Sequence, residues 1–195
     1  YGFMTGYPDG TLKLENNVTR AQITKMIITA LGDGEYGNVD MGFSQFTDVA
    51  GDHWAKNYIV YAYIREILSG FPDGSFKPEA NVTTHQAIKM ILCMLEYDKY
   101  VMFSADSGYT PFSKAKLDFP YDYLKAAEVY GLIDVSEVTT EAVPATRGYV
   151  AKLLSKALDL PIAKAVEYTT QGSVYGLMDG KNGKDFITLR MELEK

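Results

Sequence analysis

Apolar side chains recur every three or four positions in several stretches of the chain, a spacing typical of helices with one buried face. Between residues 46 and 68 this pattern predicts a helix that Asp52 can cap, with Trp54 near its start. A second helix is expected after Thr83, with a buried stripe formed by Ile88, Ile91, Leu92 and Leu95. Cys93 lies in the same apolar run, and we interpret it as a core residue. The pattern therefore predicts a unit of helix, turn and helix.

The most prominent feature of the sequence is an internal repeat. Residues 5–28 read TGYPDGTLKLENNVTRAQITKMII, and residues 69–92 read SGFPDGSFKPEANVTTHQAIKMIL. We name these segments the first copy and the second copy. They align without a gap at an offset of 64 residues. Internal repeats of this kind decide the fold, because each copy is one supersecondary unit.

Both copies carry the same turn and the same helix start. Proline presets φ and glycine takes a positive φ, so Pro-Asp-Gly predicts a tight turn. The turn residues are Asp9 and Gly10 in the first copy and Asp73 and Gly74 in the second. A threonine followed three positions later by glutamine then predicts a capping box at each helix start. The two pairs are Thr19 with Gln22 and Thr83 with Gln86.

A third, weaker unit follows the second copy. Residues 119–133 are similar to the helix after Trp54, with Phe119 at the tryptophan position. Residues 145–158 are similar to the capped helices, with Thr146-Arg147 matching Thr19-Arg20. The Pro-Asp-Gly turn is replaced by DVSEVTTEAVP, and the first half of the first unit would lie before Tyr1. Because such a repeat cannot bury its own apolar face, we expect the units to pack on one another.

The pattern changes after Pro161. Asn182-Gly183 is a hairpin turn signal, and apolar and polar residues alternate with the period of a strand between residues 186 and 193. We expect a C-terminal β-hairpin that closes the helical domain or begins a following one. The expected boundaries are a first unit at 1–42, a second at 43–103, a third at 104–160 and an extension at 161–195.

Composition and charge narrow the functional classes. The chain is 47% hydrophobic and 23% charged, which excludes a disordered tail. Its net charge of −6 argues against nucleic-acid binding, and no run is long enough to span a membrane. The two histidines lack zinc-ligand spacing, DGKNGKD at 179–185 predicts a turn rather than a calcium loop, and no catalytic or cofactor-binding motif is present. We therefore expect no enzyme, no cofactor and no metal.

These motifs resemble a known family, that of S-layer homology domains. The resemblance covers roughly residues 2–160 and rests on FTDVAGDHWAKNYI, GFPDGSFKPEANVT and GYPDGTLKLENNVTRAQITKMI. It implies a mainly α, pseudo-threefold fold in which the helices after Trp54 and its equivalents form a central bundle and the capped helices project. It also implies a secreted protein of the cell wall or surface layer. Such domains anchor proteins non-covalently to a secondary cell-wall polysaccharide, and pyruvylated amino-sugar ends are a frequent ligand.

The candidate ligand-binding residues combine this resemblance with charge. A pyruvyl ketal carries a carboxylate, which fits the planar guanidinium fork, and a helix N-terminus adds free N–H groups. Arg20 and Arg147 each follow a proposed cap, so we expect carboxylate capture there; the alternative for each is a solvated surface residue. Trp54 is expected either as a packing residue at the base of a groove or as a sugar platform. The remaining candidates are Thr5, Ser69, Thr19 and Thr84.

The second copy differs from the first at the position of the arginine. It has Thr84-His85 where the first copy has Arg20-Ala21, and a neutral threonine cannot pair with a carboxylate. We therefore expect the second copy to form the weakest anion pocket. This loss also favours a second hypothesis, in which a degenerate repeat scaffold assembles with other surface-layer subunits and binds little polymer.

Overall fold

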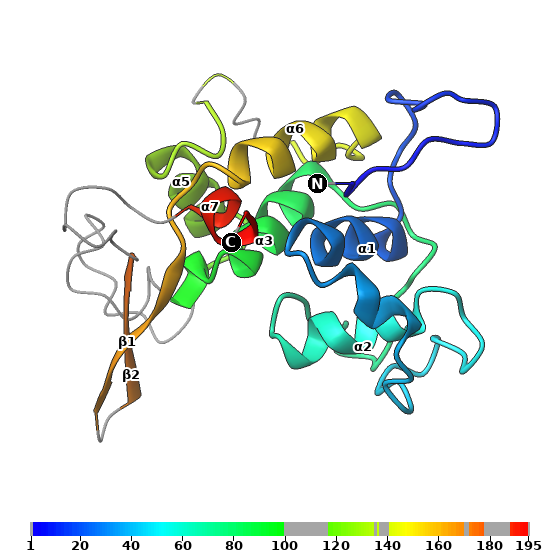
Figure 1. Cartoon of the computed structure of the whole chain (residues 1–195), viewed down its shortest axis with the longest axis horizontal. Coiled ribbons are helices and arrows are strands. Elements are labelled where there is room, and N and C mark those ends of the chain that lie inside the picture. Colours follow the sequence, from blue (N-terminus) through cyan, green and yellow to red (C-terminus); the bar gives the residue numbers. More distant parts are fainter. Residues whose placement is uncertain are drawn as a thin grey trace.

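Helices dominate the structure, a computed structural model that describes residues 2–99, 117–134, 136, 141–169, 172–177 and 188–194. The chain is mainly helical, as the apolar spacing predicts (Figure 1). The elements in chain order are α1 (Arg20–Ala30), the 3₁₀ helix η1 (Gly34–Asn38), α2 (Lys56–Ile64), α3 (Thr84–Met94), α5 (Tyr121–Val129), α6 (Arg147–Ala157), β1 (Ala163–Thr169), β2 (Gly172–Leu177) and α7 (Leu189–Leu193).

The first and second copies begin their helices with the same pair of hydrogen bonds. Thr19 Oγ1 accepts from the backbone N–H of Gln22 at 3.3 Å, and Gln22 Oε1 accepts from the Thr19 N–H at 3.1 Å. Thr83 and Gln86 repeat this exchange at 3.2 and 3.1 Å. Both capping boxes satisfy amide donors that the first turn of a helix leaves without an internal partner. The short motif therefore fixes where α1 and α3 begin.

The start of α2 differs from the prediction. The helix begins at Lys56, its N-cap is Ala55, and no side chain caps it. The expected cap, Asp52, lies in the turn before it. His53 instead binds the backbone just before the helix, because its Nδ1 accepts from the Ala55 N–H at 3.1 Å. Trp54 consequently lies in the turn that leads into α2 rather than within the helix.

The capped helices occupy the centre of the structure, which reverses the arrangement that the family resemblance implies. Helices α1, α3 and α6 contact one another, while α2 packs on α1 and α5 packs on α3 (Figure 1). Eight of the eleven residues of α1 are buried, against three of nine in α2. A helix that is apolar around most of its circumference belongs inside a protein. The burial pattern thus explains why the capped helices are central.

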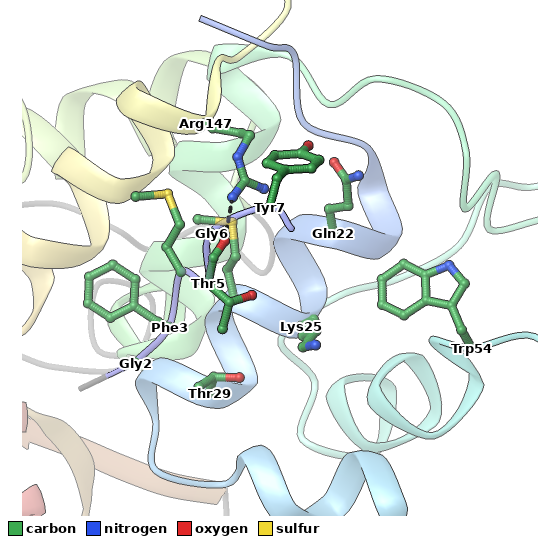
Figure 2. Close-up of a pocket in the computed structure, with 12 residues that line it drawn as sticks. Gly2, Phe3, Thr5, Gly6, Tyr7, Gln22, Lys25, Thr29, Trp54 and Arg147 are labelled. Atoms are coloured by element: carbon green, nitrogen blue, oxygen red, sulfur yellow. Dashed lines mark hydrogen bonds between the residues drawn. The ribbon is translucent and has the colours of Figure 1, made fainter. Parts of the chain in front are cut away.

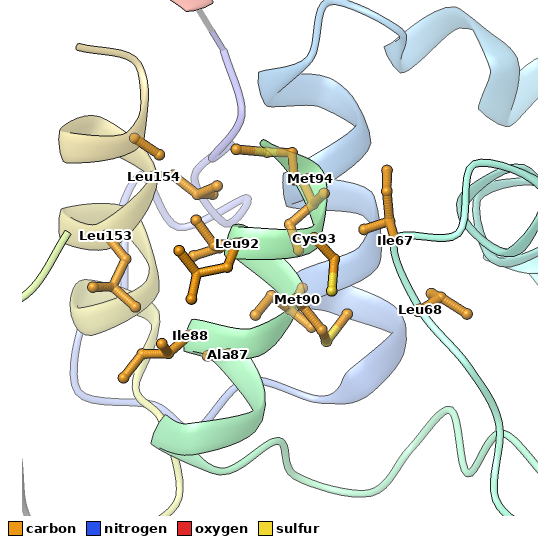
Figure 3. Packing of buried hydrophobic residues seen from close by; sticks show 14 of the residues in the cluster. Ile67, Leu68, Ala87, Ile88, Met90, Leu92, Cys93, Met94, Leu153 and Leu154 are labelled. Atoms are coloured by element: carbon orange, nitrogen blue, oxygen red, sulfur yellow. The ribbon is translucent and has the colours of Figure 1, made fainter. Parts of the chain in front are cut away.

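Helix α3 lies between α1 and α6, and its apolar side chains fill the space between them (Figure 3). Leu92 and Ile91 are almost completely buried on this helix, as are Leu153 and Leu154 on α6. Cys93 is also buried, as expected for a core residue, and burial raises the pKa of its thiol well above the usual value.

A closed cycle of three backbone hydrogen bonds joins the segments that precede the central helices. The Val18 N–H donates to the Ala145 carbonyl at 2.9 Å, the Ala145 N–H to the Val82 carbonyl at 2.8 Å, and the Val82 N–H to the Val18 carbonyl at 2.9 Å. All three residues are fully buried. Each immediately precedes the threonine that caps a helix, so the cycle brings the N-termini of α1, α3 and α6 to one place.

The C-terminal part differs from the expected hairpin. Strands β1 and β2 pair antiparallel, from Ala163 opposite Leu177 to Thr169 opposite Gly172, and both precede the predicted turn. Asn182-Gly183 and the 179–185 segment lie outside the described residues. Residues 189–193, predicted as strand, form helix α7 because Thr188 Oγ1 accepts from the Met191 N–H and caps it. Over so few residues an alternating pattern does not distinguish a strand from one capped helical turn.

We predict that Thr83→Ala lowers the free energy of unfolding by about 0.5–2 kcal/mol, because it removes the α3 cap. The measurement is equilibrium denaturation in urea. Ser155→Ala, at an exposed position of α6, is the matched control and should change stability little. Equal effects of the two substitutions would contradict the capping role.

Candidate functional site

The Pro-Asp-Gly turns of the two copies have the same geometry. Asp9 Oδ1 accepts from the backbone N–H and the hydroxyl of Thr11 at 3.0 and 2.7 Å. Asp73 Oδ1 accepts from the equivalent groups of Ser75 at 3.0 and 2.6 Å. The glycines take φ values of +77° at Gly10 and +79° at Gly74, which side-chain-bearing residues rarely adopt. These turns shape the two loops that line the candidate site.

The hydroxyl groups beside the turn carboxylates also affect their titration. Hydrogen bonds from the side chain and backbone of Ser75 hold the pKa of Asp73 below its usual value. Thr11 has the same effect on the pKa of Asp9. Each donor favours the ionised carboxylate, so both turns carry a negative charge at neutral pH.

Arg20 crosses from the first copy to the loop of the second. Its Nε donates to the Phe76 carbonyl at 2.7 Å and its Nη2 to the Ser69 carbonyl at 3.3 Å. The guanidinium carbon also lies 4.9 Å from the ring centroid of Phe71, within the range of a cation–π interaction. The residue is only 7% exposed, and burial lowers its pKa while the charge of Asp48 opposes the shift.

Arg147 makes the equivalent contacts from the third unit to the loop of the first copy. Its Nε donates to the Leu12 carbonyl at 2.9 Å and its Nη2 to the Thr5 carbonyl at 3.0 Å. The guanidinium lies 5.0 Å from the centroid of the Tyr7 ring. Because Thr5, Tyr7 and Leu12 precede Ser69, Phe71 and Phe76 by 64 residues, the two arginines hold equivalent loops.

The helix N-termini behind these arginines are already occupied. The backbone N–H of Arg20 donates to Ala80 and that of Ala21 to Pro78, each at 2.9 Å. In α6 the first two N–H groups donate to the carbonyls of Asn16 and Leu14, each at 2.8 Å. The free amide groups on which the expected anion site depended are therefore bound to carbonyls of the neighbouring unit. Any anion site must use side chains instead.

A cavity of about 220 Å³ lies between the first-copy loop, α1 and Trp54. Figure 2 shows Arg147 beside Tyr7, and the Lys25 side chain between the loop and Trp54 in this view. The residues that line this cavity are Gly2, Phe3, Met4, Thr5, Gly6, Tyr7, Gln22, Lys25, Met26, Thr29, Trp54 and Arg147.

A second cavity, of about 160 Å³, repeats the first in the second copy. Ser69, Gly70 and Phe71 replace Thr5, Gly6 and Tyr7, and Gln86, Lys89 and Met90 replace Gln22, Lys25 and Met26. The complete lining is Arg20, Ile67, Leu68, Ser69, Gly70, Phe71, Gln86, Lys89, Met90 and Phe119. We name these cavities pocket 1 and pocket 2.

Each pocket contains two cationic side chains without a carboxylate partner in the described part of the chain. They are Arg147 with Lys25 in pocket 1, and Arg20 with Lys89 in pocket 2. The Lys25 ammonium lies 5.9 Å from the Tyr58 ring, and that of Lys89 lies 5.0 Å from the Tyr123 ring. Two cations gathered in each pocket stand out in a chain with a net charge of −6, and they favour an anionic ligand.

Comparison with known proteins identifies the family. The S-layer homology domain family matches residues 1–24 and 45–87, which hold the first turn, the α1 cap, Trp54 and the complete second loop. Over these two segments the chain matches the S-layer homology family.

Several surface proteins are similar to this chain. The "Middle cell wall protein" of Brevibacillus brevis is 31% identical over 87% of the chain, and the "Cellulosome-anchoring protein" of Acetivibrio thermocellus is 36% identical over 42%. The chain covers 14% and 18% of the length of these two relatives. These names describe a cell-wall protein and an anchoring protein rather than enzymes, and they agree with the expected localisation at the cell surface.

The structure brings some of the predicted ligand residues of the S-layer homology motif together and separates others. Thr5, Trp54 and Arg147 line pocket 1, and Ser69 and Arg20 line pocket 2. Trp54 is 51% exposed, so its ring is available at the pocket wall. By contrast, Thr19 serves as a helix cap, and Thr84 lines neither of these pockets.

The lysines of the two pockets were missed by the sequence analysis. A signal for them existed, because Lys25 and Lys89 occupy the same position of the repeat. Among the described residues, no cluster of three metal-ligating side chains is found, and no helix is long and apolar enough to cross a membrane.

We predict that Ser75→Ala raises the pKa of Asp73 toward the usual carboxylate range, because the mutation removes the hydroxyl donor. The folded-state pKa of Asp73 is lowered, so its stabilising effect is present above the unfolded pKa and is lost as pH falls through the folded pKa. In the variant the stabilising effect should be smaller, and its loss should be complete at a higher pH. Carboxyl ¹³C NMR titration measures it.

Thr11→Ala is the internal control for this titration. It should move the pKa of Asp9 and leave that of Asp73 in place. An unchanged Asp73 titration in Ser75→Ala would show that the hydroxyl hydrogen bond is not responsible for the shift.

Proposed function

We propose that this chain is a non-catalytic cell-surface anchoring module that binds an anionic secondary cell-wall polysaccharide. The observation that supports it is the pair of equivalent pockets, each with two cations that lack a carboxylate partner among the described residues. The family and the anchoring relative support a cell-wall partner. The polymer's acidic group, which we propose is a pyruvyl ketal on an amino sugar, is the part that these cations would neutralise.

The pocket walls suit a sugar as well as a charge. An aromatic ring stands at one side of each pocket, Trp54 in pocket 1 and Phe119 in pocket 2, exposed by 51% and 47%. Such a ring can cover the apolar face of a sugar, while Thr5 or Ser69 supplies a hydroxyl group. Most ligand pockets combine apolar walls with a few polar groups in this way.

We further propose that the three units form a pseudo-threefold module, with unit boundaries near residues 42, 103 and 160. The cycle of hydrogen bonds before α1, α3 and α6 supports this proposal, since each unit contributes one equivalent residue to it. In such a module each pocket would be completed by groups from adjacent units. The assembly hypothesis, in which other surface-layer subunits are the partners, gains no specific support from these contacts.

Sedimentation with purified wall sacculi that carry a pyruvylated secondary polymer tests the proposed function. We expect the chain to bind intact sacculi and to remain in solution with sacculi from which the polymer has been removed by acid. Equal binding to intact and stripped sacculi, or no binding to either, would contradict the proposal.

We predict that Trp54→Ala weakens binding at pocket 1 about tenfold, because loss of about 1.4 kcal/mol of apolar contact corresponds to that factor. Tyr121→Ala is the matched control, since Tyr121 is an exposed aromatic residue that lines neither pocket. The measurement is calorimetric titration with a soluble polymer fragment. If Trp54→Ala and Tyr121→Ala bind the fragment with similar affinities, the Trp54 ring does not contribute to binding.

A further inference from the structure

We propose that the cations that contact the ligand's carboxylate are Lys25 and Lys89. Arg20 and Arg147 are positioning residues, which hold the loops of the pockets in the shape that the ligand requires. This division of roles rests on the proposed function, and it replaces direct capture by the arginines with an indirect contribution.

The hydrogen bonds of the arginines occupy one of the two edges through which a guanidinium can bind a carboxylate, and so limit direct capture. A guanidinium binds a carboxylate best through two parallel N–H groups on one edge. In Arg20 the Nε and Nη2 edge is taken by the carbonyls of Phe76 and Ser69. In Arg147 the same edge is taken by Leu12 and Thr5. Both side chains are also more than nine-tenths buried.

The carbonyls that accept from each arginine lie at the two ends of one loop. Ser69 and Phe76 flank the second turn, and Asp48 binds the N–H groups of Phe76 and Lys77 at 2.7 Å from the other side. Arg20 therefore fixes the width of the loop and sets the position of Phe71, which lies against its guanidinium. An arginine in this position shapes the pocket whether or not the ligand is charged.

The distribution of arginine among the repeats supports the same role. The helix that lacks the arginine is α3, which begins with Thr84 in its place. The backbone N–H of Thr84 donates to the Val143 carbonyl in the third unit at 2.8 Å. The third unit is also the one that lacks the Pro-Asp-Gly turn. Arginine is thus absent where the neighbouring unit lacks the Pro-Asp-Gly sequence, while the lysine of the same helix, Lys89, is retained.

The lysines have the properties of a ligand contact. Among the described residues neither Lys25 nor Lys89 forms an ion pair or hydrogen bond, and both line a pocket. Their ammonium groups lie near aromatic rings, those of Tyr58 and Tyr123, and within the described ranges their N–H donors have no hydrogen-bond acceptor. An ammonium group on a flexible stem can adjust to a carboxylate that enters the pocket.

Calorimetric titration with two probes separates the roles. The probes are a pyruvylated N-acetylhexosamine and its methyl ester, which differ in charge and little in shape. The wild-type chain should bind the acid more tightly than the ester. The double variant Lys25→Met/Lys89→Met should lose about ten- to a hundredfold in affinity for the acid and change little toward the ester. Lys125→Met, outside both pockets, is the control for loss of a lysine charge elsewhere on the chain.

The conservative variant Arg20→Lys/Arg147→Lys keeps the charge and loses the pair of hydrogen bonds that each guanidinium donates to its loop. It should weaken acid and ester by a similar factor, so that their ratio stays at the wild-type value. Circular dichroism and the single variants Arg20→Lys and Arg147→Lys establish that the chain remains folded.

The outcomes distinguish this inference from the proposed function. If the arginine variant abolishes the preference for the acid and the lysine variant keeps it, the arginines are the contact residues and the inference is wrong. If the wild-type chain binds neither probe, the proposed function is wrong and the inference fails with it. If only the lysine variant loses the preference for the acid over the ester, the result supports both the inference and the proposed function.

Discussion

The structure depends on the backbone hydrogen bonds that link the starts of the three central helices. Val18, Val82 and Ala145 exchange N–H and carbonyl groups in a closed cycle, each at 2.8–2.9 Å and fully buried. Buried peptide groups are costly to leave unpaired, so this arrangement strongly specifies which helix start lies beside which. It sends the first residues of α1 toward the second copy, and those of α6 toward the first. The pockets form where those neighbours meet.

Local features of the fold could be read from the sequence. The turns at Asp9 and Asp73 and the capping boxes at Thr19 and Thr83 involve residues within four positions of one another, and short-range chemistry determines them. The helices of the third unit also followed from their similarity to those of the earlier units. The start of α2 did not, because His53 and Asp52 are both able to accept a hydrogen bond there.

Long-range relations were beyond the sequence pattern. The partners of Arg20 are 49 and 56 residues away, and those of Arg147 are 135 and 142 residues away. A repeat shows that two copies are alike, but it does not show which copy completes the pocket of which. The expectation of a weak anion pocket in the second copy assigned each arginine to its own copy, whereas pocket 2 combines the loop and lysine of the second copy with the arginine of the first.

The substitution of Thr84 for arginine takes on a different meaning in this light. It concerns the junction between the second and third units rather than pocket 2, which retains Arg20 and Lys89. Two pockets on one chain would let a single module hold two polymer ends. Attachment through two sites is much stronger than through one when both can be engaged together.

The number of binding sites per chain tests the central claim, that pockets 1 and 2 are equivalent and both work, most directly. Equilibrium titration of the folded chain with a pyruvylated N-acetylhexosamine gives this number. We expect two equivalents of similar affinity per chain, and in Lys89→Met one of the two should weaken about ten- to a hundredfold. A single equivalent in the wild-type chain, or two sites that keep similar affinities in Lys89→Met, would contradict this claim.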